Sequence, residues 1–410
     1  MTALRSIFKT KGKGPMRHLR DQVMTQASID TKIQATFLAV AMLDALGNPL
    51  QAVPRVRTRI IDEMTPHPTT GRAPGIWTDD TSMMLCVASA IVSTDDPEEN
   101  RAEQIMALRE WKNRGYLSCL DVCFDMKPQV SNAIDMYSQL DHNPDHALHV
   151  IRSTYCGDND EDNASGSLSR ALPLAINFWR EPDQARIYGK LSSEITHPSL
   201  LCKESSSLIA YLIALILERV APHPWTRPDE VEKKLSKLTL LHEIAKFPFE
   251  NNDLRKYLTV PYGVMGRPEA EDELESWYFK HIHLLRSIVQ HQITDNPNPS
   301  LPFAIPDNDD LQTRDHALDV TLAALYCFFA TKNFEDGGLL AVNLCGEASA
   351  VGAVYGGLAA AFYAGEEGKD KLFWTKKVRE WRKTLQRQDV LDEEARKMTQ
   401  LAHRRLQEEQ

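Results

Sequence analysis

Apolar residues recur at intervals of three and four positions along most of the chain, whereas the sustained strict alternation of half-buried strands is hard to find. This pattern predicts an all-α fold, because a three- to four-residue period places apolar side chains on one face of a helix. The expected helices cover about 30–47, 78–92, 98–113, 167–179, 205–220, 228–246, 269–291, 314–331 and 348–364.

The same pattern divides the chain into three parts. Residues 1–27 are predicted to be a disordered basic tail, because the first twenty contain six Lys and Arg, no acid and a Lys-Gly-Lys-Gly-Pro run that disfavours a helix. Residues 28–366 are predicted to form one domain, because the helices after the Pro- and Asn-rich loop at 294–310 are too apolar to stand alone. Residues 367–410 are predicted to form one charged amphipathic helix, packed on that domain or extending from it.

Composition narrows the functional classes. The 42% hydrophobic and 25% charged residues are ordinary for a globular protein, and a net charge of −10 argues against general nucleic-acid binding. The longest apolar run, residues 208–217, is shorter than the roughly 18–20 residues of a membrane span. Seven scattered cysteines without a C-x-x-C pair favour a reducing, cytoplasmic location. Serine-hydrolase elbows, dinucleotide fingerprints and phosphate-loop motifs are absent from the sequence.

The sharpest polar cluster is Thr78-Asp79-Asp80-Thr81, immediately before an apolar helical stretch. Thr78 or Asp79 in this place is typical of a helix N-cap, which is a structural role. Two adjacent carboxylates with flanking hydroxyls are also the hard oxygen ligands that Mg²⁺ prefers, and the two acids repel each other unless a cation separates them. The cluster alone leaves both interpretations open.

Four further segments, at residues 44–51, 166–173, 196–198 and 343–350, change this balance. Together with residues 75–81 they resemble, in the correct order, the motifs G-D-A-L-G-x-P-x-E, G-x-W-T-D-D-T, G-x-x-M-R-x-x-P, T-H and V-N-x-G-G-D-x-D-T of the ADP-ribosylglycohydrolase family. The resemblance spans about residues 30–365 and implies that family's single-domain bundle of orthogonally packed helices.

The resemblance also implies an activity, namely Mg²⁺-assisted hydrolysis of the glycosidic bond at ribose C1″ of an ADP-ribosyl group. It implies a catalytic role for Asp79, Asp80 and Glu347, and these three with Thr78 as metal ligands. The late motif departs from the family pattern, because Glu347-Ala348-Ser349-Ala350 replaces D-x-D-T, and Gln51 replaces the family's early glutamate. With three motif carboxylates left, one Mg²⁺ is predicted rather than two, with Mn²⁺ as an alternative.

Substrate contacts are implied on the same grounds. The Gly166 turn and the start of the last core helix would offer backbone amides to the diphosphate. The implied substrate-binding residues are Gly166, Ser167, Arg170, His197, Gln51 and Ser349. Two interpretations of His197 stay open, contact with substrate or a core histidine that holds a loop, and Arg170 is open to a bracing role in the core.

Two alternatives to a hydrolase follow from the altered late motif. One is a binding or structural module that kept the fold and lost catalysis, and the other is an enzyme repurposed for a different small molecule, with Glu347 and Ser349 in a new site. In each case the expected partner is a small molecule or an ADP-ribosylated macromolecule, and no association with a membrane is expected. The histidines at 142, 146 and 149 are interpreted as a solvated face rather than a metal site.

Overall fold

The computed structural model describes residues 19–55, 60–94, 96–140, 143–157, 159–221, 234–293 and 302–408. In these ranges the regular structure is helical, and the only extended pairings are two isolated β-bridges. The predicted all-α class is therefore confirmed.

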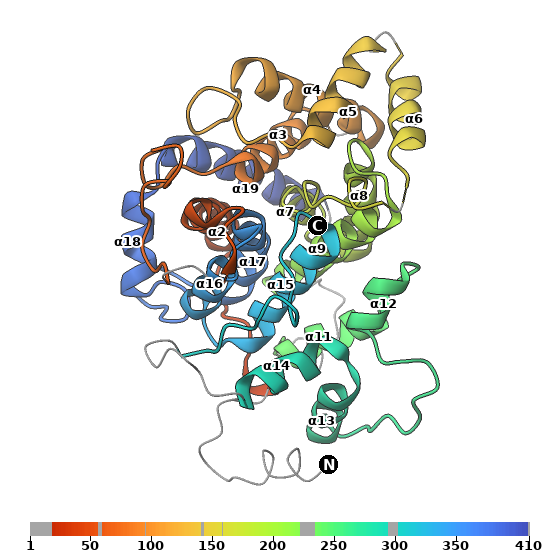
Figure 1. Ribbon diagram of the computed structural model, residues 1–410, viewed down its shortest axis with the longest axis vertical. Helices are drawn as coiled ribbons and strands as arrows, with labels where there is room; N and C mark the ends of the chain where they lie inside the picture. Colours follow the sequence, from red (N-terminus) through yellow and green to blue (C-terminus); the bar gives the residue numbers. More distant parts are fainter. Residues whose placement is uncertain are drawn as a thin grey trace.

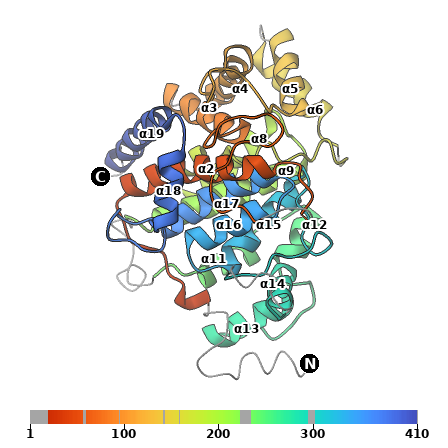
Figure 2. The same cartoon turned by 60° about the vertical axis from the view of Figure 1, so that its left-hand side comes forward.

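Two central helices, α2 (Ile29–Gly47) and α17 (Ala348–Tyr363), lie side by side in both views (Figures 1 and 2). Small residues allow this close approach, because a Cβ atom added to Gly352 would lie 2.7 Å from the carbonyl oxygen of Leu43. A Cβ on Gly356 would lie 2.7 Å from that of Ala39. The pairing brings the end of α2 against the beginning of α17, which is where the site forms.

The other helices surround this pair. The helix α3 with α4, α5 and α6 lies at the top of Figure 1, α11 to α14 lie at the bottom, and α18 and α19 cover one side. In chain order they are η1 (Leu19–Asp21), η2 (Asn48–Leu50), α3 (Asp79–Ser93), α4 (Pro97–Arg114), α5 (Pro128–Gln139), α6 (Pro144–Thr154), α7 (Ala171–Asn177), α8 (Pro182–Glu194), α9 (Leu200–Glu218), α11 (Lys237–Lys246), α12 (Asn252–Leu258), α13 (Glu271–His281), α14 (His283–Ile293), α15 (Ala317–Ala330), α16 (Phe334–Asn343), α18 (Lys376–Thr384) and α19 (Gln388–Glu408).

Two apolar cores hold the bundle together. The larger one runs through α2, α9, α15, α16 and α17, and a smaller one joins α3 to α4, α5 and α6. The helices α2 and α9 are long and apolar enough to cross a membrane, but 94% and 83% of their most apolar windows are buried in the protein. This burial is what the core helices of a globular protein show.

Several predicted segments need correction. The helix expected at 228–246 begins only at Lys237, and residues 228–233 lie outside the described ranges. The helix expected at 269–291 is two helices, α13 and α14, because the backbone at the buried Ile282 is extended. The single C-terminal helix is also two, α18 and α19, with Arg387 at a positive φ of 50° between them. The predicted tail ends earlier than residue 27, because Leu19 is fully buried and the amide of Met24 donates to the carbonyl of Leu235. Residues 1–18 lie outside the described ranges.

Candidate functional site

The start of α3 is fixed by an aspartate from another helix. Asp44, in the last turn of α2, is fully buried and accepts hydrogen bonds from the backbone N–H and the hydroxyl of Thr78, at 2.9 and 2.7 Å. It accepts the same two bonds from Thr81, at 3.1 and 2.6 Å. Thr78 is the N-cap residue of α3, as one of the two open interpretations has it, but its side chain makes no cap bond. Asp44 accepts from the free amides in its place. The carboxylates of Asp79 and Asp80 are therefore not used for capping.

These two carboxylates lie in the first turn of α3, and both are buried. Burial raises the pKa of Asp79 to about 8, while the ammonium of Lys127 opposes the rise. Burial and the neighbouring Asp79 raise the pKa of Asp80 well above its ordinary value. Within the described part of the chain no ion pair reaches Asp80. Two buried carboxylates whose pKa values are raised in this way are stabilised by a proton or by a cation near them.

Glu347 stands at the beginning of α17, opposite this turn. Its Oε2 accepts hydrogen bonds from Nε2 of Gln51 at 2.7 Å and from Nζ of Lys127 at 3.0 Å. The Gln51 amide oxygen accepts from the N–H of Ser349 at 3.2 Å, so Gln51 also satisfies a free amide at the start of α17. A parallel β-bridge between Gln51 and Gly346 holds the two segments in register. The predicted residues Gln51, Glu347 and Ser349 are thus brought together.

Lys127 reaches this cluster from the beginning of α5. Because it precedes Pro128, its backbone is extended rather than helical, at φ −71° and ψ 147°. Its ammonium lies 3.4 Å from Oδ2 of Asp315. The other oxygen of that carboxylate, Oδ1, accepts hydrogen bonds from the backbone N–H and the hydroxyl of Ser165 at 3.0 and 2.8 Å. Burial disfavours the charged ammonium, but Glu347, Asp315 and Asp79 outweigh it and raise the pKa of Lys127. Lys127 therefore stays charged.

The two sides of the site differ in the oxygen atoms that they could offer to a divalent metal ion. On the α3 side, the Thr78 hydroxyl and the two neighbouring carboxylates offer hard oxygen ligands that no protein cation has taken. On the α17 side, Ala348 and Ala350 carry no donor atom, and the Ser349 hydroxyl donates to the backbone carbonyl of Asp44 at 3.2 Å. Across the described ranges, no three His, Cys, Asp or Glu side chains are grouped at metal-ligand spacing.

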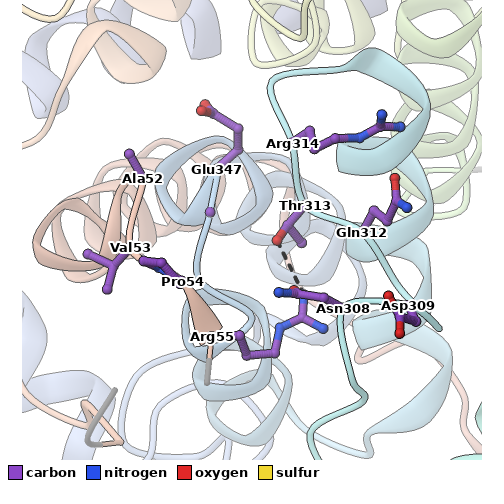
Figure 3. A pocket seen from close by; sticks show the side chains of 11 residues that line it. Ala52, Val53, Pro54, Arg55, Asn308, Asp309, Gln312, Thr313, Arg314 and Glu347 are labelled. Atoms are coloured by element: carbon purple, nitrogen blue, oxygen red, sulfur yellow. Dashed lines mark hydrogen bonds between the residues drawn. The ribbon is translucent and has the colours of Figure 1, made fainter. Parts of the chain in front are cut away.

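Two cavities adjoin the Lys127–Glu347 ion pair. One, of about 410 Å³, is lined by residues 52–55, by residues 308–309 and 312–314, and by Gly346 and Glu347 (Figure 3). The other, of about 460 Å³, is lined by Lys127 and Asp315 together with the start of α5. Glu347 lines the first cavity and Lys127 the second, and their charged groups are 3.0 Å apart. Both volumes are in the range of small-molecule sites.

Arg55 fixes the wall of the first cavity. Its guanidinium donates to the backbone carbonyls of Leu344 at 2.7 Å, Pro306 at 2.6 Å and Leu311 at 2.9 Å. Figure 3 shows Arg55 below the cavity, joined by a further bond to Thr313. The irregular segment after residue 301 is thereby tied to the turn that precedes α17.

Comparison with known proteins shows to which family this chain belongs. Residues 25–409 match the ADP-ribosylglycohydrolase family, which is nearly the whole chain. The chain belongs to the ADP-ribosylglycohydrolase family. It is 24% identical over 355 residues to "ADP-ribosylarginine hydrolase Tri1" of Pseudomonas putida, covering 85% of this chain and 76% of that protein. It is 23% identical to the protein of the same name from Serratia proteamaculans, covering 81% and 71%.

The fold comparison agrees with this assignment. A solved structure described as "ADP-ribosylglycohydrolase-related protein complex" superposes with a TM-score of 0.59 at 21% identity, covering 92% of this chain and 99% of that one. The family resemblance inferred from the five motifs is therefore confirmed, and so is the family's helical fold.

The middle motif of the family is packed in the core of the bundle. A Cβ on Gly166 would be 3.1 Å from Cε1 of His197, and Arg170 donates to the Thr196 hydroxyl at 2.7 Å. The Ser167 hydroxyl is 3.0 Å from that of Ser206. Gly166, Ser167, Arg170 and His197 are all buried, and none lines either cavity. These contacts agree with the core interpretation of His197 and with a bracing role of Arg170. Contact with substrate stays a prediction, since Thr78, Asp79 and Asp80 line neither cavity either.

The burial of His197 predicts a pH-dependent stability. Burial and Arg170 lower the pKa of His197 from 6.5 to about 3, so the unfolded chain binds a proton below pH 6.5 that the folded protein refuses. Stability is therefore lost as pH falls from about 6.5 towards 3, and at pH 5 this loss is about 2 kcal/mol. Denaturant unfolding at pH 7 and pH 5 should show that His197→Gln reduces the difference by this amount. His149→Gln, at an exposed position, should leave the difference unchanged.

Three residues of the site were not predicted. Asp44 stands within the early family motif but was given no role, although an acid in the last turn of an apolar helix is a signal for a buried polar contact. Lys127 and Asp315 belong to no predicted site, because their contacts with Glu347 form only in the folded chain. In the histidine cluster, His146 and His149 are exposed, and His142 lies outside the described residues.

Proposed function

We propose that the protein hydrolyses the glycosidic bond at ribose C1″ of an ADP-ribosyl group, with arginine as the linked residue. The observation that carries the proposal is the buried Asp79–Asp80 pair, whose carboxylates have raised pKa values, feel the charge of Glu347 at Asp80 and make no ion pair within the described residues. Family membership supports the reaction class. The two relatives named as ADP-ribosylarginine hydrolases support arginine as the linkage.

The site residues divide into ligands and positioning groups. Thr78, Asp79 and Asp80 would hold one Mg²⁺, which when bound polarises the reacting oxygen or acidifies a water molecule. Asp44 fixes the turn from which all three project. Glu347 faces the cavity with its carboxylate held by two donors, so it is placed to orient the attacking water and to accept its proton.

An assay of ADP-ribose release tests this function. The purified protein is incubated with an arginine-ADP-ribosylated peptide, and free ADP-ribose is measured with Mg²⁺, with Mn²⁺ and after chelation. We expect release that falls at least about tenfold on chelation and returns with Mg²⁺, because the α3 carboxylates repel each other without a cation. A serine-ADP-ribosylated peptide of the same sequence is the matched control. Release from the serine peptide alone would overturn the arginine assignment, and no release from either would overturn the hydrolase.

A specific observation favours a second candidate, a family member that binds its ligand without hydrolysis. Ala348 and Ala350 supply no ligand, and the charge of Glu347 is already balanced by Lys127. A binding module would show a higher melting temperature with ADP-ribose, because a ligand that binds only the native state stabilises it, but no release from either peptide. The combination of a thermal shift and no turnover would therefore select this candidate over the hydrolase.

A further inference from the structure

The charge pattern around Lys127 differs from that of an ordinary surface ion pair. Its ammonium joins Glu347 at the start of α17 to Asp315 just before α15, and it also acts on the buried carboxylates of α3. The Lys127 side chain is 24% exposed and that of Glu347 only 10%, so solvent screens the pair little. Lys127 is thus a fixed positive charge at the centre of a group of acids.

The Glu347 carboxylate is surrounded by groups that suit the ammonium of Lys127 better than a metal ion. Gln51 presents its amide N–H to the carboxylate and its amide oxygen to the N–H of Ser349, so both ends of the amide are used. A glutamate in place of Gln51 would add a negatively charged metal ligand. The Gln51 amide carries no charge, and both of its ends are already hydrogen-bonded within the protein. Ser349 is turned away towards α2. On the α17 side, hydrogen-bond donors from Gln51 and Lys127 therefore point at Glu347. A second metal ion in this place would need oxygen acceptors instead.

We propose that the Lys127 ammonium occupies the place of a second divalent cation, so that the site works with one metal ion at α3 and one lysine at α17. This inference rests on the proposed function for the metal ion at α3. The lysine brings a single positive charge and, unlike a metal ion, it cannot leave the site. It holds Glu347 and Asp315 in place through ion pairs. Lys127 is accordingly a positioning residue for Glu347.

The experiment is a titration of Mn²⁺ into metal-free protein, followed by calorimetry and by electron paramagnetic resonance. Wild type is expected to bind one ion per chain, with the spectrum of an isolated Mn²⁺. Lys127→Met removes the charge and frees the carboxylates of Glu347 and Asp315 as ligands. We therefore expect a second ion at millimolar Mn²⁺ and a spin-coupled spectrum from two neighbouring ions. Lys127→Arg keeps the charge and should retain one ion.

A matched control is Lys112→Met, because Lys112 makes an ion pair with Asp135 between α4 and α5, outside the site. It should bind one ion like wild type. If Lys127→Met does not fold, Lys127→Gln provides the neutral variant, since it keeps a donor for Glu347.

The outcomes separate the two proposals. Two ions in wild type, or an unchanged single ion in Lys127→Met, would overturn the role of Lys127 and leave the proposed function standing. No ion in any variant would overturn the metal part of the proposed function, and the lysine inference with it.

Discussion

An Asp44→Asn variant is expected to lose about 3–5 kcal/mol of unfolding free energy, because four donors converge on this one buried carboxylate. Burial raises the pKa of Asp44, and the four donors oppose that rise. Asparagine has a single acceptor oxygen, and its NH₂ group would face N–H and O–H donors of Thr78 and Thr81. The beginning of α3 would then keep unsatisfied donors in the core. Urea unfolding followed by circular dichroism measures the loss.

Asp30→Asn is the matched control, because Asp30 lies on the same helix but at the surface, with its side chain half exposed beside His403. Its effect should stay below about 1 kcal/mol. A double-mutant cycle of Asp44→Asn with Thr81→Val should show strong coupling, since Thr81→Val removes the 2.6 Å bond from the Thr81 hydroxyl to Asp44. A loss as small as that of Asp30→Asn, without coupling, would mean that Asp44 does not hold α3.

Apolar periodicity was sufficient to predict the central helices, because their burial imposes the pattern. The expected and observed bounds of α2, α3 and α17 differ by no more than one or two residues. The helices α5, α6 and α8 were missed, although each begins with a proline, which is common in the first turn of a helix. The helix α16 was missed because Gly337 and Gly338 suggest a loop, whereas in the fold they allow contact with Tyr355 and Leu43.

The site was predictable only as far as local motifs reach. Thr78, Asp79 and Asp80 stand together in the sequence, and the family motif indicates their role. The partners of Glu347 are not local, because Lys127 is 220 positions away and Gln51 is 296. The break before α19 gave no signal either, since no glycine or proline marks the positive φ of Arg387. Contacts of this kind are decided by packing, which a single sequence does not display.

Asp80→Asn is expected to have opposite effects on stability and on activity. Burial and the charge of Asp79 raise the pKa of Asp80, so the folded protein binds a proton more tightly than the unfolded chain does. The stability that depends on this proton is present at low pH and is lost as pH rises through the folded pKa. The neutral asparagine avoids this loss, and we expect a gain of about 1–3 kcal/mol for the metal-free protein at neutral pH.

The same substitution should lower kcat/KM about 1000-fold, which corresponds to about 4 kcal/mol of transition-state stabilisation, because one of the two carboxylates that would hold the metal ion is gone. Urea unfolding of the metal-free proteins and ADP-ribose release with Mg²⁺ measure the two effects. Asp253→Asn, at an exposed position on α12, is the control for both and should change neither.

Addition of Mg²⁺ should raise the melting temperature of wild type and leave that of Asp80→Asn unchanged. A variant that is less stable than wild type without metal would show that the Asp80 carboxylate serves the fold, and a variant with full activity would exclude it from the site. A metal ligand such as Asp80 should destabilise the metal-free protein and stabilise it when a cation is bound. A structural acid such as Asp44 should stabilise the protein in both states.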